Sequence, residues 1–323
     1  MIKNMSTPAI GIPYRSHRFP HGRISQHQNP LLIEVQELIW AAITVGRANM
    51  LDVLAHGHYS EFELIYRLSI LLANLTTTRQ NRLAKSAAFL HLDPSEKSAI
   101  SYFLGLTMSK LFAEKLLKVP WLLHLDVYRD QLGVTAGVGV RQKPDLLGLS
   151  DANDWIVLES KGRANGLTAG LLQKGKTQTR MIRSIAGKRP RLRISAVTHF
   201  VKGNLHFDWL DPEDEAEDAI DLKTTLNDYL LLYYRLIYTT LSSHEAQNNN
   251  GFRVYTFADL GISVGLLESI FQAYSQQRLE IIEAPIGREF NRLPIVANQR
   301  FYVGRDGIAV GVSPDIRKRL IYQ

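Results

Sequence analysis

Residues 143–163 read KPDLLGLSDANDWIVLESKGR, and the core of the fold can be predicted from this stretch. Two short apolar runs flank the turn-forming residues 150–154, which predicts a β-hairpin. A turn centred near Ala152 pairs Asp145 with Glu159, because residues equidistant from the centre lie opposite each other. Directly opposed side chains have Cβ atoms about 5 Å apart. The spacing therefore brings two carboxyl groups together at the open end of the hairpin.

The same register predicts how the hairpin is buried. It pairs Leu147 with Val157, and apolar residues occupy both faces of the two runs. Strands that are apolar on both faces are central strands covered on both sides. Glu159 and Lys161 are two residues apart, so their side chains project from the same face. One face therefore carries two carboxylates and an ammonium beside a buried strand pair.

This group of charges predicts a magnesium site. Two adjacent carboxylates repel each other unless a cation lies between them, and a few oxygen ligands with an open hydration sphere suit Mg²⁺. Bound Mg²⁺ activates water and stabilises phosphoryl charge, and Lys161 would orient the nucleophile or support the developing anion. The chain has no cysteine, which excludes disulfides, Cys-ligated zinc, iron–sulfur clusters and thiol nucleophiles.

Helices and strands alternate around the hairpin. Asp93-Pro94 is typical of a helix N-terminus, and Pro120 prevents that helix from continuing. We expect this helix to run to about Leu117, followed by strands at 121–128, 137–149 and 154–160, a helix at 168–186, and strands at 191–201 and 205–209 joined by the turn Lys202-Gly203-Asn204.

The rest of the chain extends this core into a larger α/β protein, in which we expect a mixed sheet flanked by helices. We divide it into an irregular basic arm at 1–29, an N-terminal helical region at 30–94 whose first helix begins near Leu31, the core at 95–210, and a C-terminal helix plus α/β extension at 211–323. In the extension we expect a helix at 220–241, a strand at 252–257, a helix at 264–276 and a hairpin with its turn at 304–307.

Pro144-Asp145 followed by Glu159-x-Lys161, within this order of elements, resembles the PD-(D/E)xK nuclease superfamily, which has the restriction-endonuclease-like fold. The resemblance covers about residues 95–210. It implies that Asp145, Glu159 and the backbone carbonyl of Ser160 bind Mg²⁺, for which Mn²⁺ can substitute. It also implies that Lys161 assists the attacking water. The alternative is a surface hairpin with an ordinary Glu–Lys pair.

Members of this superfamily often add a glutamine from the following helix and sometimes a glutamate from the preceding one. Gln178 is the only strongly polar residue in the helical stripe of Leu171, Gly175, Gln178, Ile182 and Ile185. It is therefore the candidate for the glutamine, and Glu114 is the candidate for the upstream acid. The alternatives are a satisfied helix side chain for Gln178 and a solvated glutamate beside Lys115 for Glu114.

Charge favours a polyanionic partner. The chain has 38 Lys and Arg against 31 Asp and Glu, a net charge of +7. Nine basic residues and no acidic residue lie between 162 and 193, whereas segment 208–221 has eight acidic residues, no Lys or Arg, and the character of a linker. We expect phosphate contacts from Arg163, Lys174, Lys176, Arg180, Arg183, Lys188 and Arg189.

We therefore expect a Mg²⁺-dependent nuclease that hydrolyses phosphodiester bonds as an endonuclease, with double-stranded DNA as its substrate. Restriction or anti-phage defence, and DNA repair, recombination or transposition, are the expected settings, and cleavage of both strands favours a homodimer or larger complex. The alternative is a non-catalytic nucleic-acid-binding or assembly subunit that keeps the fold. The sequence shows no signal-peptide pattern and no apolar stretch of membrane-spanning length, so we expect a cytoplasmic protein without a membrane partner.

Overall fold

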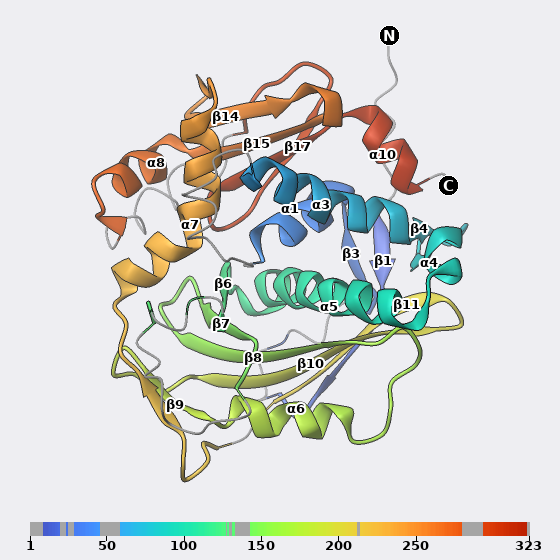
Figure 1. The fold of residues 1–323 in the computed structure, drawn as a ribbon, viewed down its shortest axis with the longest axis vertical. Helices are drawn as coiled ribbons and strands as arrows, with labels where there is room; N and C mark the ends of the chain where they lie inside the picture. The colour runs from blue at the N-terminus through green and yellow to red at the C-terminus, as the bar shows by residue number, and fades with distance from the viewer. Residues whose placement is uncertain are drawn as a thin grey trace.

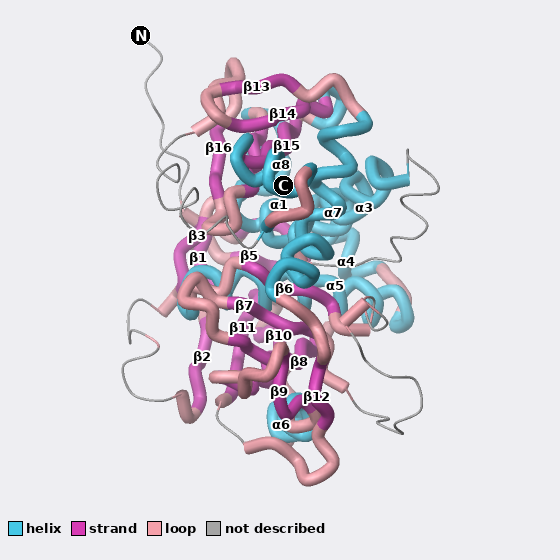
Figure 2. The backbone as a smooth tube through the Cα atoms, turned by 90° about the vertical axis from the view of Figure 1, so that its left-hand side faces the viewer, coloured by secondary structure: helices cyan, strands magenta, loops and turns pink. Residues whose placement is uncertain are grey.

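The computed structural model describes residues 9–19, 24, 29–45, 59–126, 128, 131–132, 143–211, 214–279 and 293–321. It confirms the α/β class: a mixed sheet is flanked by helices (Figure 1). A separate antiparallel sheet from the C-terminal region lies at the other end of the molecule (Figure 2). Across these residues, no helix combines the length and the apolar character needed to cross a membrane.

The central sheet contains eight strands in the described part of the chain: β2 (Tyr14–His17), β4 (Leu75–Thr77), β5 (Leu83–Lys85), β6 (Trp121–His124), β7 (Leu146–Leu149), β8 (Trp155–Gly162), β10 (Leu192–Val201) and β11 (Asn204–Leu210). Their order is β4-β5-β11-β10-β8-β7-β6, and β2 also pairs with β11. β8 pairs in parallel with β10, and β2 in parallel with β11. The predicted core strands are present, but two are shorter than predicted: β6 ends at His124 and not near 128, and residues 143–145 precede β7. Residues 137–142 of the second predicted strand lie outside the described residues.

Helix α5 (Pro94–Leu117) covers one face of this sheet, and α6 (Leu171–Thr179) covers the other (Figure 1). Asp93 caps α5, as predicted. Its carboxylate accepts a hydrogen bond from the Glu96 N–H at 3.1 Å, and the Glu96 side chain accepts one from the Asp93 N–H at 3.0 Å. This reciprocal capping box satisfies backbone donors that the first helical turn leaves unpaired.

Two glycines let the helices approach the sheet closely. A Cβ atom on Gly162 of β8 would lie 1.6 Å from the carbonyl oxygen of Ser101 on α5. A Cβ atom on Gly175 of α6 would lie 2.1 Å from Ser195 Oγ of β10 and 3.3 Å from Glu159 Cγ. Any larger residue would push α5 or α6 away from the strands that carry the motif.

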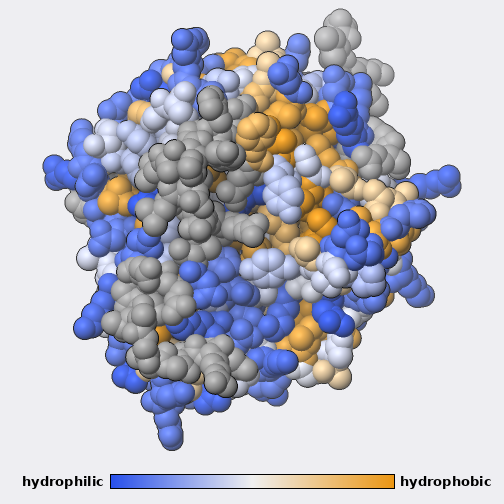
Figure 3. Space-filling model, in the orientation of Figure 1, coloured by the Kyte–Doolittle hydropathy of each residue, from blue (hydrophilic) through white to orange (hydrophobic). Residues whose placement is uncertain are grey.

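The aromatic part of the core lies between α5 and the sheet. Phe112 of α5 stacks on Phe207 of β11 with ring centroids 4.1 Å apart, and Trp209 contacts both rings. All three side chains are buried. On the face shown in Figure 3, hydrophobic residues gather above the sheet, around α1 (Val35–Thr44) and α3 (Tyr59–Asn74), and hydrophilic residues gather lower down.

The N-terminal region contains strands that were not predicted. β1 (Ile10–Ile12) pairs with β3 (Leu31–Ile33), and β2 joins the central sheet, so the prediction of an irregular arm is wrong for these residues. The first helix begins at Val35 and not near Leu31. Strands of three or four residues carry almost no periodic signal, and these pair with residues distant in the sequence. The region predicted to be helical contains α1, α3 and α4 (Ala87–His91), but β3, β4 and β5 also lie in it, so the prediction of a purely helical region is wrong.

The helix predicted at 168–186 is too long. α6 ends at Thr179, and the chain continues as β9 (Ile182–Ile185), which pairs in parallel with β12 (Ile220–Leu222). Ile182 and Ile185 fit the apolar spacing of a helix, but their backbone pairs with a partner contributed by the acidic segment. That segment is therefore more than a linker: its two ends belong to β11 and β12.

The C-terminal region is built around the antiparallel sheet β13-β14-β15-β17-β16. Its elements are α7 (Leu226–Ser243), β13 (Gln247–Asn249), β14 (Phe252–Phe257), η1 (Ala258–Leu260), β15 (Ile262–Leu267), α8 (Glu268–Ser275), β16 (Arg300–Val303), β17 (Ile308–Val312) and α10 (Pro314–Ile321). The predicted strand at 252–257 and the predicted hairpin are confirmed. The prediction of helix is wrong for 264–267, which form the end of β15, and for 220–225, which precede α7.

Candidate active site

The hairpin has the register that the sequence predicts. β7 and β8 are antiparallel and pair Leu147 with Val157. Asp145 directly precedes β7, and its N–H donates a hydrogen bond to Glu159 Oε2 at 3.1 Å. The N–H of Ser160 donates in turn to Asp145 Oδ2 at 2.9 Å. The two carboxyl groups therefore meet where β7 begins, as the spacing requires.

Lys161 and Gln178 complete this group. The Lys161 ammonium donates hydrogen bonds to Glu159 Oε1 at 2.5 Å and to Gln178 Oε1 at 2.9 Å. Gln178 Nε2 donates to the carbonyl of Lys143 at 3.1 Å, just before the Pro-Asp pair. The structure thus brings together Asp145, Glu159, Lys161 and Gln178, which come from two strands and the helix that follows them.

Burial raises the free energy of ionising the carboxyl groups of Asp145 and Glu159. Glu159 is 2% exposed. Burial and the neighbouring Asp145 raise the pKa of Glu159 to about 8, although Lys161 opposes the shift. Burial also raises the pKa of Asp145, against the hydrogen bond from Ser160 and the positive charges of His124 and Lys161. A cation placed between the carboxyl groups would remove much of this penalty.

The backbone of Ser160 provides a third oxygen at this point. The N–H and C=O of one strand residue point to the same side, so the N–H that reaches Asp145 places the Ser160 carbonyl on that side too. The register brings position 144 opposite Ser160, and Pro144 has no N–H to donate to that carbonyl. The carbonyl is therefore free of a ladder donor from β7.

These oxygen atoms fit a magnesium ion. No group of three or more His, Cys, Asp or Glu side chains suited to a metal occurs among the residues that the structure describes. Mg²⁺ needs fewer protein ligands than that, because it usually keeps several waters and binds through one or two carboxylates together with substrate phosphates. Asp145, Glu159 and the Ser160 carbonyl match that donor set.

Two residues near the site were missed in the sequence. His124, the last residue of β6, lies close enough to Asp145 for its charge to lower the pKa of that carboxyl group. Its Nε2 forms a hydrogen bond of 2.8 Å with the hydroxyl of Tyr102 on α5. The pairing of β6 with β7, which places His124 opposite Leu146, would have identified this residue. The long connection between these two strands leaves their register undetermined by sequence alone.

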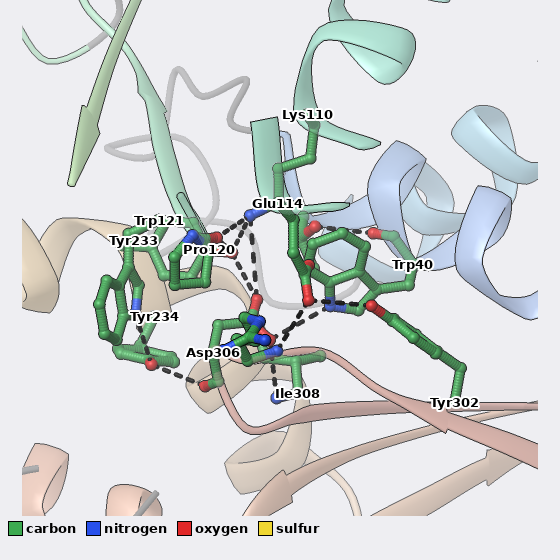
Figure 4. Close-up of polar contacts among 12 residues, drawn as sticks. Trp40, Lys110, Glu114, Pro120, Trp121, Tyr233, Tyr234, Tyr302, Asp306 and Ile308 are labelled. Atoms are coloured by element: carbon green, nitrogen blue, oxygen red, sulfur yellow. Dashed lines mark hydrogen bonds and ion pairs between the residues drawn. The ribbon is translucent and has the colours of Figure 1, made fainter. Parts of the chain in front are cut away.

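The structure does not bring Glu114 to this site. α5 faces β8 through Ser109, whose hydroxyl donates to Ser160 Oγ at 3.0 Å. Glu114 is five residues further along and so projects about 140° away around the helix. Its Oε1 accepts hydrogen bonds from the Tyr302 hydroxyl at 2.9 Å and the Arg305 N–H at 3.0 Å (Figure 4). Burial raises the pKa of Glu114 to about 7 in this separate cluster.

The acidic segment folds back onto the basic one, and one of the predicted phosphate contacts, Lys176, is wrong. Lys176 is 1% exposed and donates to the carbonyl of Arg193, so it cannot reach a phosphate. Arg183 pairs with Asp221 at 3.3 Å. Two further bonds to the acidic segment join Arg189 with Glu215 at 2.8 Å and Arg180 with the carbonyl of Asp214 at 3.1 Å.

Three of the predicted basic residues stay available in the described structure. Arg163, Lys174 and Lys188 are exposed and form no ion pair with a described carboxylate. Arg163 follows β8 directly, only two residues after Lys161, and Lys174 lies on α6. The positive surface beside the motif is therefore smaller than the sequence suggests.

Comparison of the chain with protein-family models, with curated proteins and with solved structures gave no match.

Proposed function

We propose that the chain is a Mg²⁺-dependent nuclease with the restriction-endonuclease-like fold of the PD-(D/E)xK superfamily. The observation that supports this most directly is the meeting of Asp145, Glu159 and Lys161 at the end of a buried hairpin. A mixed sheet with parallel neighbours β8 and β10, covered by α5 and α6 on opposite faces, is consistent with that fold. We further propose cleavage of DNA as an endonuclease.

Each residue of the site would have its own role. Asp145, Glu159 and the Ser160 carbonyl would hold Mg²⁺, which supplies activation of water and stabilisation of phosphoryl charge when bound. Lys161 would hold the attacking water by a hydrogen bond and support the negative charge that develops in the transition state. Gln178 would keep the Lys161 ammonium at that position, because its carbonyl oxygen already accepts a hydrogen bond from it.

Each chain contains one such group, so cleavage of both DNA strands would require a second copy or two successive nicks. The proposal is tested by incubating the full-length protein with supercoiled plasmid, linear duplex and single-stranded DNA, in Mg²⁺ or in EDTA. We expect nicked or linear plasmid in Mg²⁺ and none in EDTA, and no product from Lys161→Ala. A wild-type protein that cuts none of the three substrates in Mg²⁺ or Mn²⁺ would favour the non-catalytic alternative.

A further inference from the structure

The face of the central sheet that carries Glu159 and Lys161 continues across three more strands. Register pairs run in two rows across β8, β10, β11 and β2: Glu159, Ser195, Leu210 and His17 in the first, and Lys161, Val197, Asp208 and Arg15 in the second. Paired residues on neighbouring strands project from the same face. Strands lie about 4.8 Å apart, so the far end of each row is about 14 Å from the motif.

Asp208 organises a cluster of histidines at that far end. Its Oδ1 lies 2.9 Å from His17 Nε2, and its Oδ2 lies 2.9 Å from His199 Nε2. Burial would raise the pKa of Asp208, but the hydrogen bonds with His199 and His17 outweigh it and hold that pKa below its usual value. The carboxylate therefore stays ionised, and both of its oxygens are used to orient imidazole rings.

The side chains around this carboxylate provide a surplus of hydrogen-bond donors. Arg15 is exposed, and 41% of the His17 side chain is exposed. His206 lies beside His199 with ring centroids 5.7 Å apart, and burial together with the charges of His199, Arg15 and Arg82 lowers its pKa. Arg82 Nη1 is buried and has no hydrogen-bond partner within the described structure. Such a surplus suits an anion.

We propose that Arg15 and His17, supported by His206, form a second phosphate-binding subsite for the nucleic-acid strand. This inference rests on the proposed nuclease function and adds a substrate contact to it. Helix α6 packs over β10 and β11 between the motif and these residues, so the nucleic-acid strand would pass beside α6 to reach both sites, which lie about 14 Å apart. The subsite would position the strand and take no part in the chemistry.

The placement explains why the N-terminal strand pairs with the sheet edge. β2 pairs in parallel with β11 next to the shared face, which brings Arg15 and His17 from the start of the chain to a line with Lys161 and Glu159. Asp208 fixes His17 by a hydrogen bond, and Arg15 remains exposed beside it. If β2 served only to stabilise the sheet, the hydrogen bond from His17 to Asp208 would be enough, and Arg15 would not be needed.

The test is equilibrium binding of the full-length protein in EDTA, which prevents cleavage, to a labelled duplex long enough to reach both sites. Arg15→Ala is compared with Arg278→Ala, which removes the same charge from an exposed position just after α8. Figure 2 shows α8 and β2 at opposite ends of the molecule. We expect Arg15→Ala to weaken binding and to reduce the slope of log K against log salt by about 1, the effect of one lost phosphate contact. Arg278→Ala should leave the slope unchanged.

Hydrolysis of a small phosphodiester, bis(p-nitrophenyl) phosphate, separates this proposal from the proposed function, because such a substrate reaches only the motif. We expect Arg15→Ala to leave its turnover at the wild-type rate and to raise KM for a long duplex, with Arg15→Lys restoring most of the loss. Equal binding and equal KM for Arg15→Ala and Arg278→Ala would overturn the subsite alone. A wild-type protein that binds no duplex would overturn both proposals.

Discussion

Lys161 and Gln178 meet across the candidate site, with the ammonium of Lys161 2.9 Å from the amide oxygen of Gln178. The same ammonium lies 2.5 Å from Glu159 Oε1. A carboxyl oxygen and an amide oxygen therefore fix its position. Gln178 is fixed in turn by the bond from its amide to the Lys143 carbonyl. This link connects α6 to both strands of the hairpin.

Removing the side chain of Gln178 should therefore lower cleavage without destroying it. We expect Gln178→Ala to reduce the cleavage rate about tenfold, because one hydrogen bond to a charged group is worth about 1.5 kcal/mol. Gln173→Ala, an exposed position on the same helix, is the matched control and should cleave at the wild-type rate. Equal rates for the two variants would show that Gln178 does not position Lys161.

The raised pKa of Glu159 predicts how stability changes with pH in metal-free protein. The unfolded carboxyl group titrates near 4.5, and the folded one at about 8. The stability that this group contributes is complete below the unfolded pKa and is lost as pH rises through the folded one. Thermal melts in EDTA should therefore show Tm falling between about pH 5 and pH 8.

Mg²⁺ should reverse that loss, because it binds the ionised folded site and not the unfolded chain. The rise in Tm on adding Mg²⁺ should be larger at pH 8.5 than at pH 6. Glu159→Gln, which cannot ionise, should show a weaker pH dependence and no rise with Mg²⁺. A Tm that is equally insensitive to Mg²⁺ at both pH values in the wild type would contradict a metal site here.

Gly175 is predicted to control the distance between α6 and the site. Gly175→Ala places a methyl group 2.1 Å from Ser195 Oγ, so α6 must move outward and take Gln178 with it. Overpacking of this kind costs about 1–3 kcal/mol, and we expect lower Tm and slower cleavage. Gly166→Ala, where the nearest atom is 3.9 Å away, should behave as wild type. Failure of Ser195→Gly to restore Gly175→Ala would show that this contact is not the cause.

Asp306 is predicted to be essential for stability rather than for cleavage. It is fully buried 3.9 Å from the Lys110 ammonium and accepts hydrogen bonds from Tyr233 at 2.6 Å and Trp40 at 3.2 Å (Figure 4). Asp306→Ala leaves Lys110 buried without its carboxylate and should cost about 3–5 kcal/mol in denaturant unfolding.

The control for Asp306 is the exposed ion pair of Asp151 and Arg305, whose Oδ2 and Nη1 atoms lie 3.0 Å apart. Exposed pairs are worth about 0–1 kcal/mol, so Asp151→Ala should hardly change the free energy of unfolding. If Asp306→Ala unfolds at the same denaturant concentration as Asp151→Ala, the buried cluster does not hold the C-terminal sheet to α5.

The sequence predicts those features whose signals are local. The capping box at Asp93, the hairpin register and the turn at Lys202-Gly203, where both residues have positive φ, all follow from residues close together in the chain. Gln178 was found from a helical stripe of nearby residues, of which Leu171 and Gly175 lie on α6 while Ile182 and Ile185 belong to β9. These signals place four strands, two helices and four side chains.

The features that were missed depend on pairing between distant segments. Nothing near Ile182 shows that its backbone will pair with Ile220, and nothing near Lys176 shows that its ammonium will bind the carbonyl of Arg193. Glu114 was misplaced because its direction depends on how α5 is rotated against β8. That rotation follows from the close contact at Gly162, which only the folded chain reveals.

Cleavage of plasmid DNA shows whether Asp145, Glu159 and Lys161 form a metal-dependent phosphodiesterase site. Conversion of supercoiled plasmid is followed for the wild type, Glu159→Gln and Gly166→Ala, in Mg²⁺ and in EDTA. We expect cleavage by the wild type and Gly166→Ala in Mg²⁺ only, and none by Glu159→Gln, although that variant stays folded. Equal cleavage by Glu159→Gln and the wild type would contradict such a site, as would cleavage that persists in EDTA.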